Sequence, residues 1–462
     1  MPPTKRQAKP SSTKIILTPE ARAALSLLEH SHEPVFLTGR AGTGKSTLLQ
    51  YFRANTEKKM VVLAPTGVAA VNVRGQTVHS FFGFGPDITV DKVRRRRGKS
   101  ADLFQKLEAI VIDEISMVRA DLLDCIDAFL RLNGPKPRQP FGGIQMIFVG
   151  DLYQLPPVVP PDDEEVFNSF YKSPYFFDAR AFALQSLQVV ELTRVWRQHD
   201  RGFVSILDAI RTASIRDAEL AFLNRRCLVR GQPKHHPGVV HLVPTNFQAD
   251  RINHAHLNSL PGDVTTFTGV LEGDFSRRSL PTSLALPLKP GSQIMMLAND
   301  YNDRFVNGDM GVIEDIDEDE PEEAIVVRLT NGYRGKITPY TWEAIRFSYD
   351  SERDRIIAET LGSFTQYPVR LAWALTIHKA QGQTFDRVVV DFGRGTFAHG
   401  QAYVALSRCR RLEGLTLRTP LQRQHLIVDP RIRDFLSTGH TPAPQLALTF
   451  APERAWQGKD AF

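Results

Sequence analysis

Short apolar runs alternate with helix-like stretches along the first third of the chain. The runs are VFLTG from residue 35, MVVLAPT from 60, AIVIDE from 109 and GIQMIFVGD from 143. They are apolar almost throughout rather than at every second position, which is typical of strands buried on both faces of a parallel sheet. We therefore predict an α/β fold whose sheet carries helices on both faces.

A second region of the chain shows the same pattern. The apolar runs there are VVHLVPT from 239, LTIH from 375 and RVVVDF from 387. Between them, residues 289–365 hold the strand-like segments SQIMML, MGVIEDI, AIVVRLT and YRGKITP, separated by Gly, Asn and Asp. Turn residues at such short intervals indicate antiparallel strands. We predict a second α/β lobe with a small all-β barrel inserted in it.

These patterns divide the 462 residues into four parts. Residues 17–190 form the first lobe and residues 191–437 the second, while 1–16 and 438–462 are predicted to be poorly ordered tails, the first of them basic. A small insertion at 83–105 carries four consecutive arginines, Arg94 to Arg97. An acidic turn at 314–323 would repel a nucleic acid, so we expect it to lie away from any such partner.

The composition excludes some classes of protein. No apolar run approaches the roughly 20 residues of a membrane span, and we expect no membrane partner. The three cysteines, Cys125, Cys227 and Cys409, follow no metal-ligand spacing and are expected to be reduced. A net charge of +6 with a pI near 9.1 favours a polyanionic partner.

A glycine-rich loop follows the first apolar run and reads G-x-x-x-x-G-K-S. Such a loop turns its backbone N–H groups toward phosphate oxygens, and glycines leave room for that approach. The lysine reaches the β- and γ-phosphates and the serine hydroxyl binds Mg²⁺. The candidate nucleotide-binding residues are Gly39, Gly42, Thr43, Gly44, Lys45, Ser46 and Thr47.

Two carboxylates follow the third apolar run directly. Asp113 could hold Mg²⁺ together with Ser46, and Glu114 could deprotonate a hydrolytic water. Acidic residues are also favoured in the first turn of a helix, but the phosphate-binding loop upstream favours the catalytic interpretation. The sequence therefore predicts hydrolysis of ATP with Mg²⁺.

Three further residues are candidates for sensing or stabilising the γ-phosphate. Gln154 follows the fourth apolar run in GDLYQLPPV, at the same edge of the sheet. Arg197 in LTRVWRQ and Arg408 in YVALSR could stabilise the charge from across a cleft. An arginine in isolation is more often a salt-bridge partner, so we interpret these two only as part of the set.

Taken together, these motifs resemble those of superfamily 1B helicases, and within them the Pif-type family, which is related to RecD. The matching segments occur in the family's order and span residues 39–408. They are GRAGTGKS, APTGVAAVNVRGQTVHSFF, DEISMV, FGGIQMIFVGD, GDLYQLPPV, LTRVWRQ, VPTN, LTIHKAQGQTFD and YVALSR.

The resemblance implies two RecA-like lobes with a Src-homology-three-like barrel in the second, and a wedge at residues 83–105. It implies an ATPase site made of Lys45, Ser46, Asp113, Glu114, Gln154, Arg197 and Arg408. Gly382 and Gln383 lie in a motif that touches both nucleotide and DNA in the family. The path of single-stranded DNA across the protein would be lined by Thr66, His79, Thr376, His378 and Lys379.

The implied activity is that of an ATP-dependent DNA helicase moving 5′-to-3′ on single-stranded DNA, as a monomer. Duplex junctions, G-quadruplexes and RNA–DNA hybrids are candidate substrates, in repair, recombination or telomere maintenance. The compartment would be the nucleoid of a bacterial cytoplasm, or the nucleus or mitochondria of a eukaryote. A RecD-like subunit of a larger complex and a non-translocating clamp on single-stranded DNA remain open as alternatives.

One position departs from the family pattern. Relatives often carry a Gln that contacts adenine near the start of the first lobe, where LTPEARAAL has Ala21. We therefore expect weak discrimination between nucleobases.

Overall fold

The computed structural model describes residues 17–438, except 199, 228–237, 301, 303, 318–323, 394 and 397. The predicted tails lie outside this range, apart from Thr438 at the end of the last helix, and so does most of the predicted acidic turn. Among the described helices, none is long and apolar enough to cross a membrane.

The first lobe is built on a six-stranded parallel sheet with the order β3-β2-β4-β5-β1-β6. All four apolar runs predicted in this part of the chain are strands of this sheet, and every residue of β1, β4 and β5 is buried. The strands are β1 (Val35–Gly39), β2 (Met60–Ala64), β3 (Gln76–Thr77), β4 (Ala109–Ile112), β5 (Gln145–Val149) and β6 (Gln188–Leu192).

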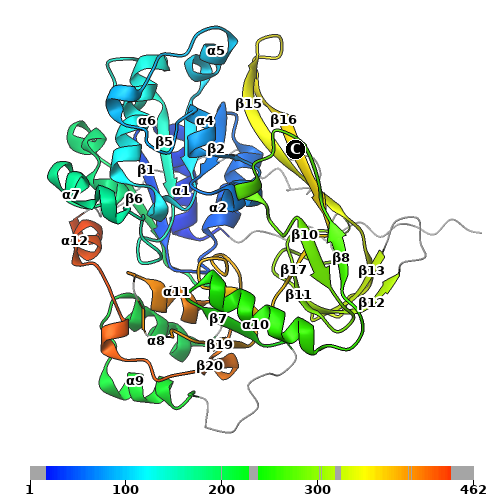
Figure 1. Ribbon diagram of the computed structural model, residues 1–462. Helices are drawn as coiled ribbons and strands as arrows, with labels where there is room; N and C mark the ends of the chain where they lie inside the picture. The colour runs from blue at the N-terminus through cyan, green and yellow to red at the C-terminus, as the bar shows by residue number, and fades with distance from the viewer. Residues whose placement is uncertain are drawn as a thin grey trace, which may run out of the picture.

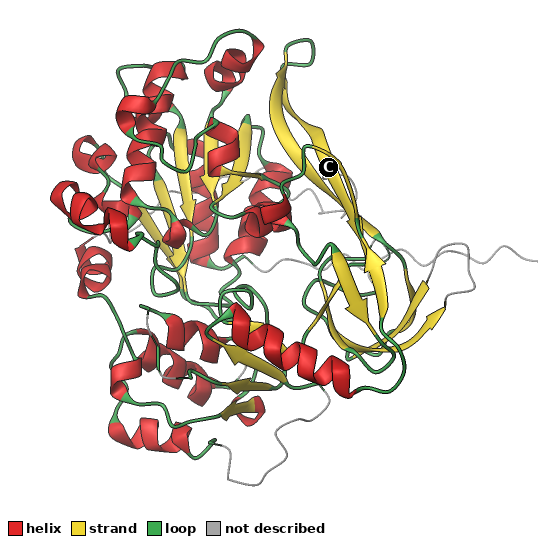
Figure 2. Ribbon diagram, in the orientation of Figure 1, coloured by secondary structure: helices red, strands yellow, loops and turns green. Residues whose placement is uncertain are grey.

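Helices cover the sheet of the first lobe, as Figures 1 and 2 show. One side packs through a cluster that includes Ala24, Leu28, Leu48 and Phe52. The helices are α1 (Pro19–His30), α2 (Lys45–Asn55), α3 (Gly67–Asn72), α4 (Val78–Phe82), α5 (Lys99–Lys106), α6 (Ala120–Asn133) and α7 (Pro161–Phe170).

The second lobe has a four-stranded parallel sheet with the order β18-β7-β19-β20. Its strands are β7 (Val240–Val243), β18 (Ala374–Thr376), β19 (Val388–Val390) and β20 (Leu415–Leu417). Its helices are α8 (Arg201–Arg211), α9 (Asp217–Asn224), α10 (Asn246–Ser259), α11 (Gln401–Ser407) and α12 (Pro430–Thr438). The last of these returns to the first lobe, where the ring of Phe435 stacks on Phe177 with centroids 4.2 Å apart.

Between β7 and β18 the chain forms antiparallel sheets. Four predicted strands, β11 (Gln293–Met296), β12 (Met310–Asp317), β13 (Ala324–Leu329) and β14 (Arg334–Ile337), join β17 (Val369–Leu371) in one five-stranded sheet. A ribbon of β8 (Thr265–Thr268) and β10 (Ala285–Leu288) packs on the same apolar core. The antiparallel region therefore runs from Thr265 to Leu371, beyond the predicted bounds of 289–365.

A long hairpin in this region forms a separate sheet rather than a wall of the predicted barrel. It consists of β15 (Tyr340–Asp350) and β16 (Arg355–Gln366), with β9 (Val270–Gly273) along one edge. Figure 1 shows it extending beside the first lobe. Its Phe347 donates its backbone N–H to Gln76 Oε1 at 2.9 Å, and the Phe347 ring packs edge-on against Phe81. The hairpin thus joins the all-β region to the first lobe.

The three cysteines are free thiols in different environments. Burial raises the pKa of Cys125 to about 12 and that of Cys409 to about 11, whereas Cys227 is half-buried. Because only the thiolate reacts, we expect N-ethylmaleimide at pH 8 to label only Cys227 rapidly in the native protein and all three cysteines in denaturant. Mass spectrometry counts the labels; rapid double labelling of native protein would contradict this structure.

Candidate active site

The phosphate-binding loop depends on glycines with positive φ. Gly42 has φ +80° and Gly44, which caps α2, has φ +88°. A side chain at Gly42 would place its Cβ 2.4 Å from Cβ of Arg197, which follows the last strand of the first sheet. The loop therefore needs glycine both for its backbone conformation and for the close approach of the segment that carries Arg197.

Lys45 begins α2 and folds back over the loop. Its Nζ donates to the carbonyl oxygens of Gly39 at 2.6 Å and Arg40 at 3.1 Å. Burial lowers the pKa of Lys45, and the nearby carboxylates of Asp151 and Glu114 oppose that shift. Phosphate oxygens could replace the two carbonyl groups as acceptors, which is how this lysine acts in phosphate-binding loops.

Asp113 and Glu114 lie at the carboxyl end of β4, beside the loop. Glu114 has a left-handed backbone, φ +51°, and its N–H donates to Asp113 Oδ1 at 2.9 Å. Burial raises the pKa of both side chains, and that of Glu114, which the neighbouring Asp113 raises further, to about 7. A carboxylate of raised pKa is a stronger base, as abstraction of a proton from water requires. Glu114 Oε2 accepts a 3.0 Å hydrogen bond from Gln381 Nε2 of the second lobe.

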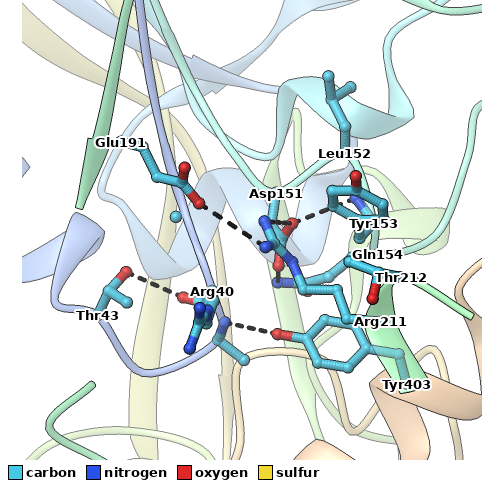
Figure 3. A network of polar contacts seen from close by, with 12 residues as sticks. Arg40, Thr43, Asp151, Leu152, Tyr153, Gln154, Glu191, Arg211, Thr212 and Tyr403 are labelled. Carbon is cyan, nitrogen blue, oxygen red and sulfur yellow. Dashed lines mark hydrogen bonds and ion pairs between the residues drawn. The ribbon is translucent and has the colours of Figure 1, made fainter. Parts of the chain in front are cut away.

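A buried ion pair supports the end of β5 (Figure 3). Asp151 is fully buried, and its Oδ1 lies 3.2 Å from an Nη2 of Arg211 at the end of α8. Asp151 also accepts from the N–H of Tyr153 and, at 3.4 Å, from Nε2 of Gln154. Burial alone would raise the pKa of Asp151, but Arg211 and then Lys45 outweigh it and hold that pKa below its usual range. The charged pair thereby anchors Gln154 at the edge of the site.

Arg197 packs beside the loop at Gly42, whereas Arg408 lies at the end of α11 in the second lobe. Nη2 of Arg197 donates to the carbonyl of Gly382 at 3.0 Å, while its Nη1 is buried and has no hydrogen-bond partner among the described residues. Arg408 is 1% exposed and donates to Val404 O and Ser407 Oγ. Burial lowers the pKa of both arginines, and their proximity lowers the pKa of Arg408 further. Two arginines removed from water, one of which has an N–H group with no acceptor, suit the binding of an anion such as the γ-phosphate.

These groups surround one cavity of about 640 Å³ between the lobes, within the usual range for small-molecule sites. It unites nearly all the residues predicted for the ATPase site. Its walls are Ala41, Gly42, Thr43, Gly44, Lys45, Ser46, Thr47, Asp113, Glu114, Gly150, Gln154, Trp196, Arg197, Gly382, Thr384, Arg408 and Arg410.

Two predicted nucleotide-binding residues are not in these walls. Gly39 contributes only its carbonyl, which accepts from Lys45. The side chain of Gln383 instead donates to Asn307 Oδ1 of the all-β region at 3.3 Å. A side chain at Gly308 would collide with Gln383 Oε1, so the two segments are closely packed.

The residues predicted to line DNA differ in exposure. Thr66 is exposed and caps α3 after β2, and His79 is half-buried in α4. His378 and Lys379 are exposed just beyond β18. Thr376 is buried, and its hydroxyl accepts from the N–H of Lys379, so it shapes this turn instead of presenting its hydroxyl to solvent. The DNA-binding role of these residues stays a prediction.

Several residues of the site lie outside the predicted set, and three of them contact the loop or its carboxylates. Tyr403 accepts the N–H of Ala41 at 3.0 Å, and Gln381 contacts Glu114 as described above. Both lie inside quoted motifs, so their position was a usable signal. Arg211 lies at the end of an amphipathic helix, and no local pattern marks it as the partner of Asp151.

Two RecA-like lobes that share a phosphate-binding cavity, with the loop on the first lobe and Arg408 on the second, define a P-loop motor ATPase. A sequence model described as "PIF1-like helicase" matches residues 18–218. The ATP-dependent DNA helicase Pif1 of Bdellovibrio bacteriovorus is 33% identical over 91% of this chain and 92% of its own length. The chain belongs to the PIF1-like helicase family.

Other relatives agree. Mouse PIF1 is 35% identical over 89% of this chain, which spans 61% of the mouse protein. The crystal structure of Bacteroides sp Pif1 in complex with ADP-AlF4 superposes with a TM-score of 0.85, at 35% identity, covering 92% of this chain and 97% of that one. Bacteroides Pif1 bound to ssDNA, at 36% identity and the same coverage, gives a TM-score of 0.66. These matches confirm the predicted family and the α/β fold.

Proposed function

We propose that this protein hydrolyses ATP in the cavity between its lobes in order to translocate on single-stranded DNA and separate duplexes. The observation that carries the proposal is that Lys45 of the first lobe and Arg408 of the second line one cavity. A site completed only by both lobes makes hydrolysis depend on their relative position, as a motor requires.

The residues of the cavity suit hydrolysis by water. Glu114 would take a proton from the water as its oxygen attacks the γ-phosphorus, while the bond to the bridging oxygen breaks and ADP leaves. Lys45, Arg197 and Arg408 would stabilise the charge on the transferred group. Ser46 and Asp113 would hold Mg²⁺, which supplies further charge neutralisation when bound.

Single-stranded DNA is the proposed track. Bacteroides Pif1 has been crystallised bound to ssDNA, and the predicted track residues Thr66, His378 and Lys379 are exposed here. Hydroxyl, imidazole and ammonium groups contact phosphates and stack on bases without reading sequence. The family resemblance supports 5′-to-3′ movement and action at junctions of single-stranded and duplex DNA.

Stimulation of hydrolysis by DNA tests this function. We expect single-stranded oligonucleotides to raise kcat for ATP at least about tenfold, because the track closes the cleft on the nucleotide. Lys45→Ala should abolish the stimulated rate, since it removes a donor to the phosphates. If single-stranded DNA leaves the ATPase rate unchanged, the proposal is refuted. If only RNA raises the rate, the protein moves on RNA and not on DNA.

Ala21 carries a separate prediction about the nucleobase. It is buried among apolar side chains of α1, and its side chain offers no amide to adenine. We expect kcat/KM for ATP and GTP to agree within about tenfold, since no unsatisfied hydrogen bond penalises guanine there. Ala21→Gln should raise the preference for ATP. A preference of about a hundredfold in the parent protein would show that another group reads the base.

A further inference from the structure

A single turn lies between the predicted DNA track and the ATPase site. It begins beside β7, where the N–H of Ile377 donates to Val243 O at 2.9 Å. Backbone hydrogen bonds from Ala380 to Thr376 and from Gln381 to His378, of 3.0 and 3.1 Å, close the turn. Such short-range bonds make the segment compact, so that a shift at one of its ends moves the other.

The two sides of this turn face different partners. His378 and Lys379 are exposed, on the side assigned to DNA. Only two residues beyond Lys379, Gln381 reaches across the cleft and donates from Nε2 to Glu114 Oε2 at 3.0 Å. The next residue, Gly382, accepts from Arg197 Nη2 at 3.0 Å. One turn therefore contacts both the proposed base and one of the two arginines.

The bond to Gln381 controls how the Glu114 carboxylate is oriented. The terminal torsion of a glutamate side chain is broad, so an unrestrained carboxylate samples many orientations. A donor fixed on Oε2 holds the group in one orientation and leaves Oε1 free to accept a proton. Catalytic groups act efficiently only when they are held near the productive geometry.

We propose that Gln381 is a positioning residue that links DNA at His378 and Lys379 to the orientation of the Glu114 carboxylate. DNA on the exposed side of the turn fixes the turn, and the turn fixes Glu114 through Gln381. The inference rests on the proposed function, because it requires single-stranded DNA to occupy that side. It assigns to one side chain the coupling between DNA occupancy and hydrolysis.

The test is the ratio of kcat with saturating single-stranded DNA to kcat without it. Gln381→Met keeps the length of the side chain and removes the donor, and we expect it to lower this ratio about tenfold, with KM for ATP changed less than about twofold. Gln424→Met is the control, since Gln424 is exposed and its amide bonds to the neighbouring Gln422. This control should keep the parent's ratio.

The outcomes separate the two proposals. A parent protein whose ATPase ignores single-stranded DNA refutes the proposed function itself. Suppose instead that single-stranded DNA stimulates the parent protein and that Gln381→Met keeps the parent's ratio. Only the role of Gln381 is then overturned, even if kcat with and without DNA both change. The role of Gln381 is also overturned if Gln381→Met loses affinity for single-stranded DNA by the same factor as the ratio falls, because Gln381 would then contact DNA directly. If Gln381→Met does not fold, Gln381→Asn, whose amide is too short to reach Glu114, must show the lowered ratio.

Discussion

Glu114→Gln is expected to stop ATP hydrolysis while leaving nucleotide binding intact. The amide keeps the shape of the side chain but cannot accept a proton from water, and we expect kcat to fall about 10³-fold, within the range for loss of a general base. Binding should persist because Lys45, Arg197 and the loop N–H groups remain. Single-turnover hydrolysis and the fluorescence of a labelled ATP analogue measure the two properties separately.

The control for this experiment is Glu57→Gln, since Glu57 is exposed outside the site. It should hydrolyse ATP at the parent's rate. A Glu114→Gln variant with near-normal turnover would mean that another group removes the proton. Loss of nucleotide affinity together with turnover would instead mean that Glu114 supports the structure of the pocket.

Arg211→Ala is expected to destabilise the protein by about 3–5 kcal/mol, because it leaves the fully buried carboxylate of Asp151 without its cation. Arg328→Ala breaks an exposed ion pair with Glu314, which water screens, and should leave the stability nearly unchanged. Urea unfolding followed by tryptophan fluorescence compares the two variants. The double variant Asp151→Asn, Arg211→Met should recover much of the loss, since no charge stays buried alone.

If Arg211→Ala and Arg328→Ala were equally stable, the buried ion pair between Arg211 and Asp151 would not stabilise the protein as described. The double variant also separates stability from catalysis. We expect it to fold but to hydrolyse ATP slowly, because Gln154 loses its charged anchor on Asp151.

Much of this site was predictable because its parts are local in sequence. Buried parallel strands read as continuous apolar runs, and a phosphate-binding loop and a carboxylate pair follow two of them directly. In a parallel sheet the carboxyl ends of the strands meet at one edge. The strand pattern and these motifs were therefore enough to bring Lys45, Asp113 and Gln154 together.

The rest depends on contacts between distant segments. Asp151 and Arg211 are 60 positions apart, and Glu114 and Gln381 are 267 apart. The hairpin of β15 and β16 lies within the bounds predicted for the barrel, but it forms a separate sheet and its Phe347 packs on the first lobe. Gln383, predicted to touch the nucleotide, bonds through its side chain to Asn307 of the all-β region. Residue type alone does not specify such partners.

The measurement that tests the central claim most directly is ATP-dependent unwinding of two duplexes that differ only in their overhang. One carries a 5′ single-stranded tail and the other a 3′ tail of the same length and sequence, and strand separation is followed by fluorescence under single-turnover conditions. We predict unwinding of the 5′-tailed duplex with ATP, and none by Lys45→Ala. Unwinding only from the 3′ tail, or none from either by a protein that hydrolyses ATP, would contradict a 5′-to-3′ helicase.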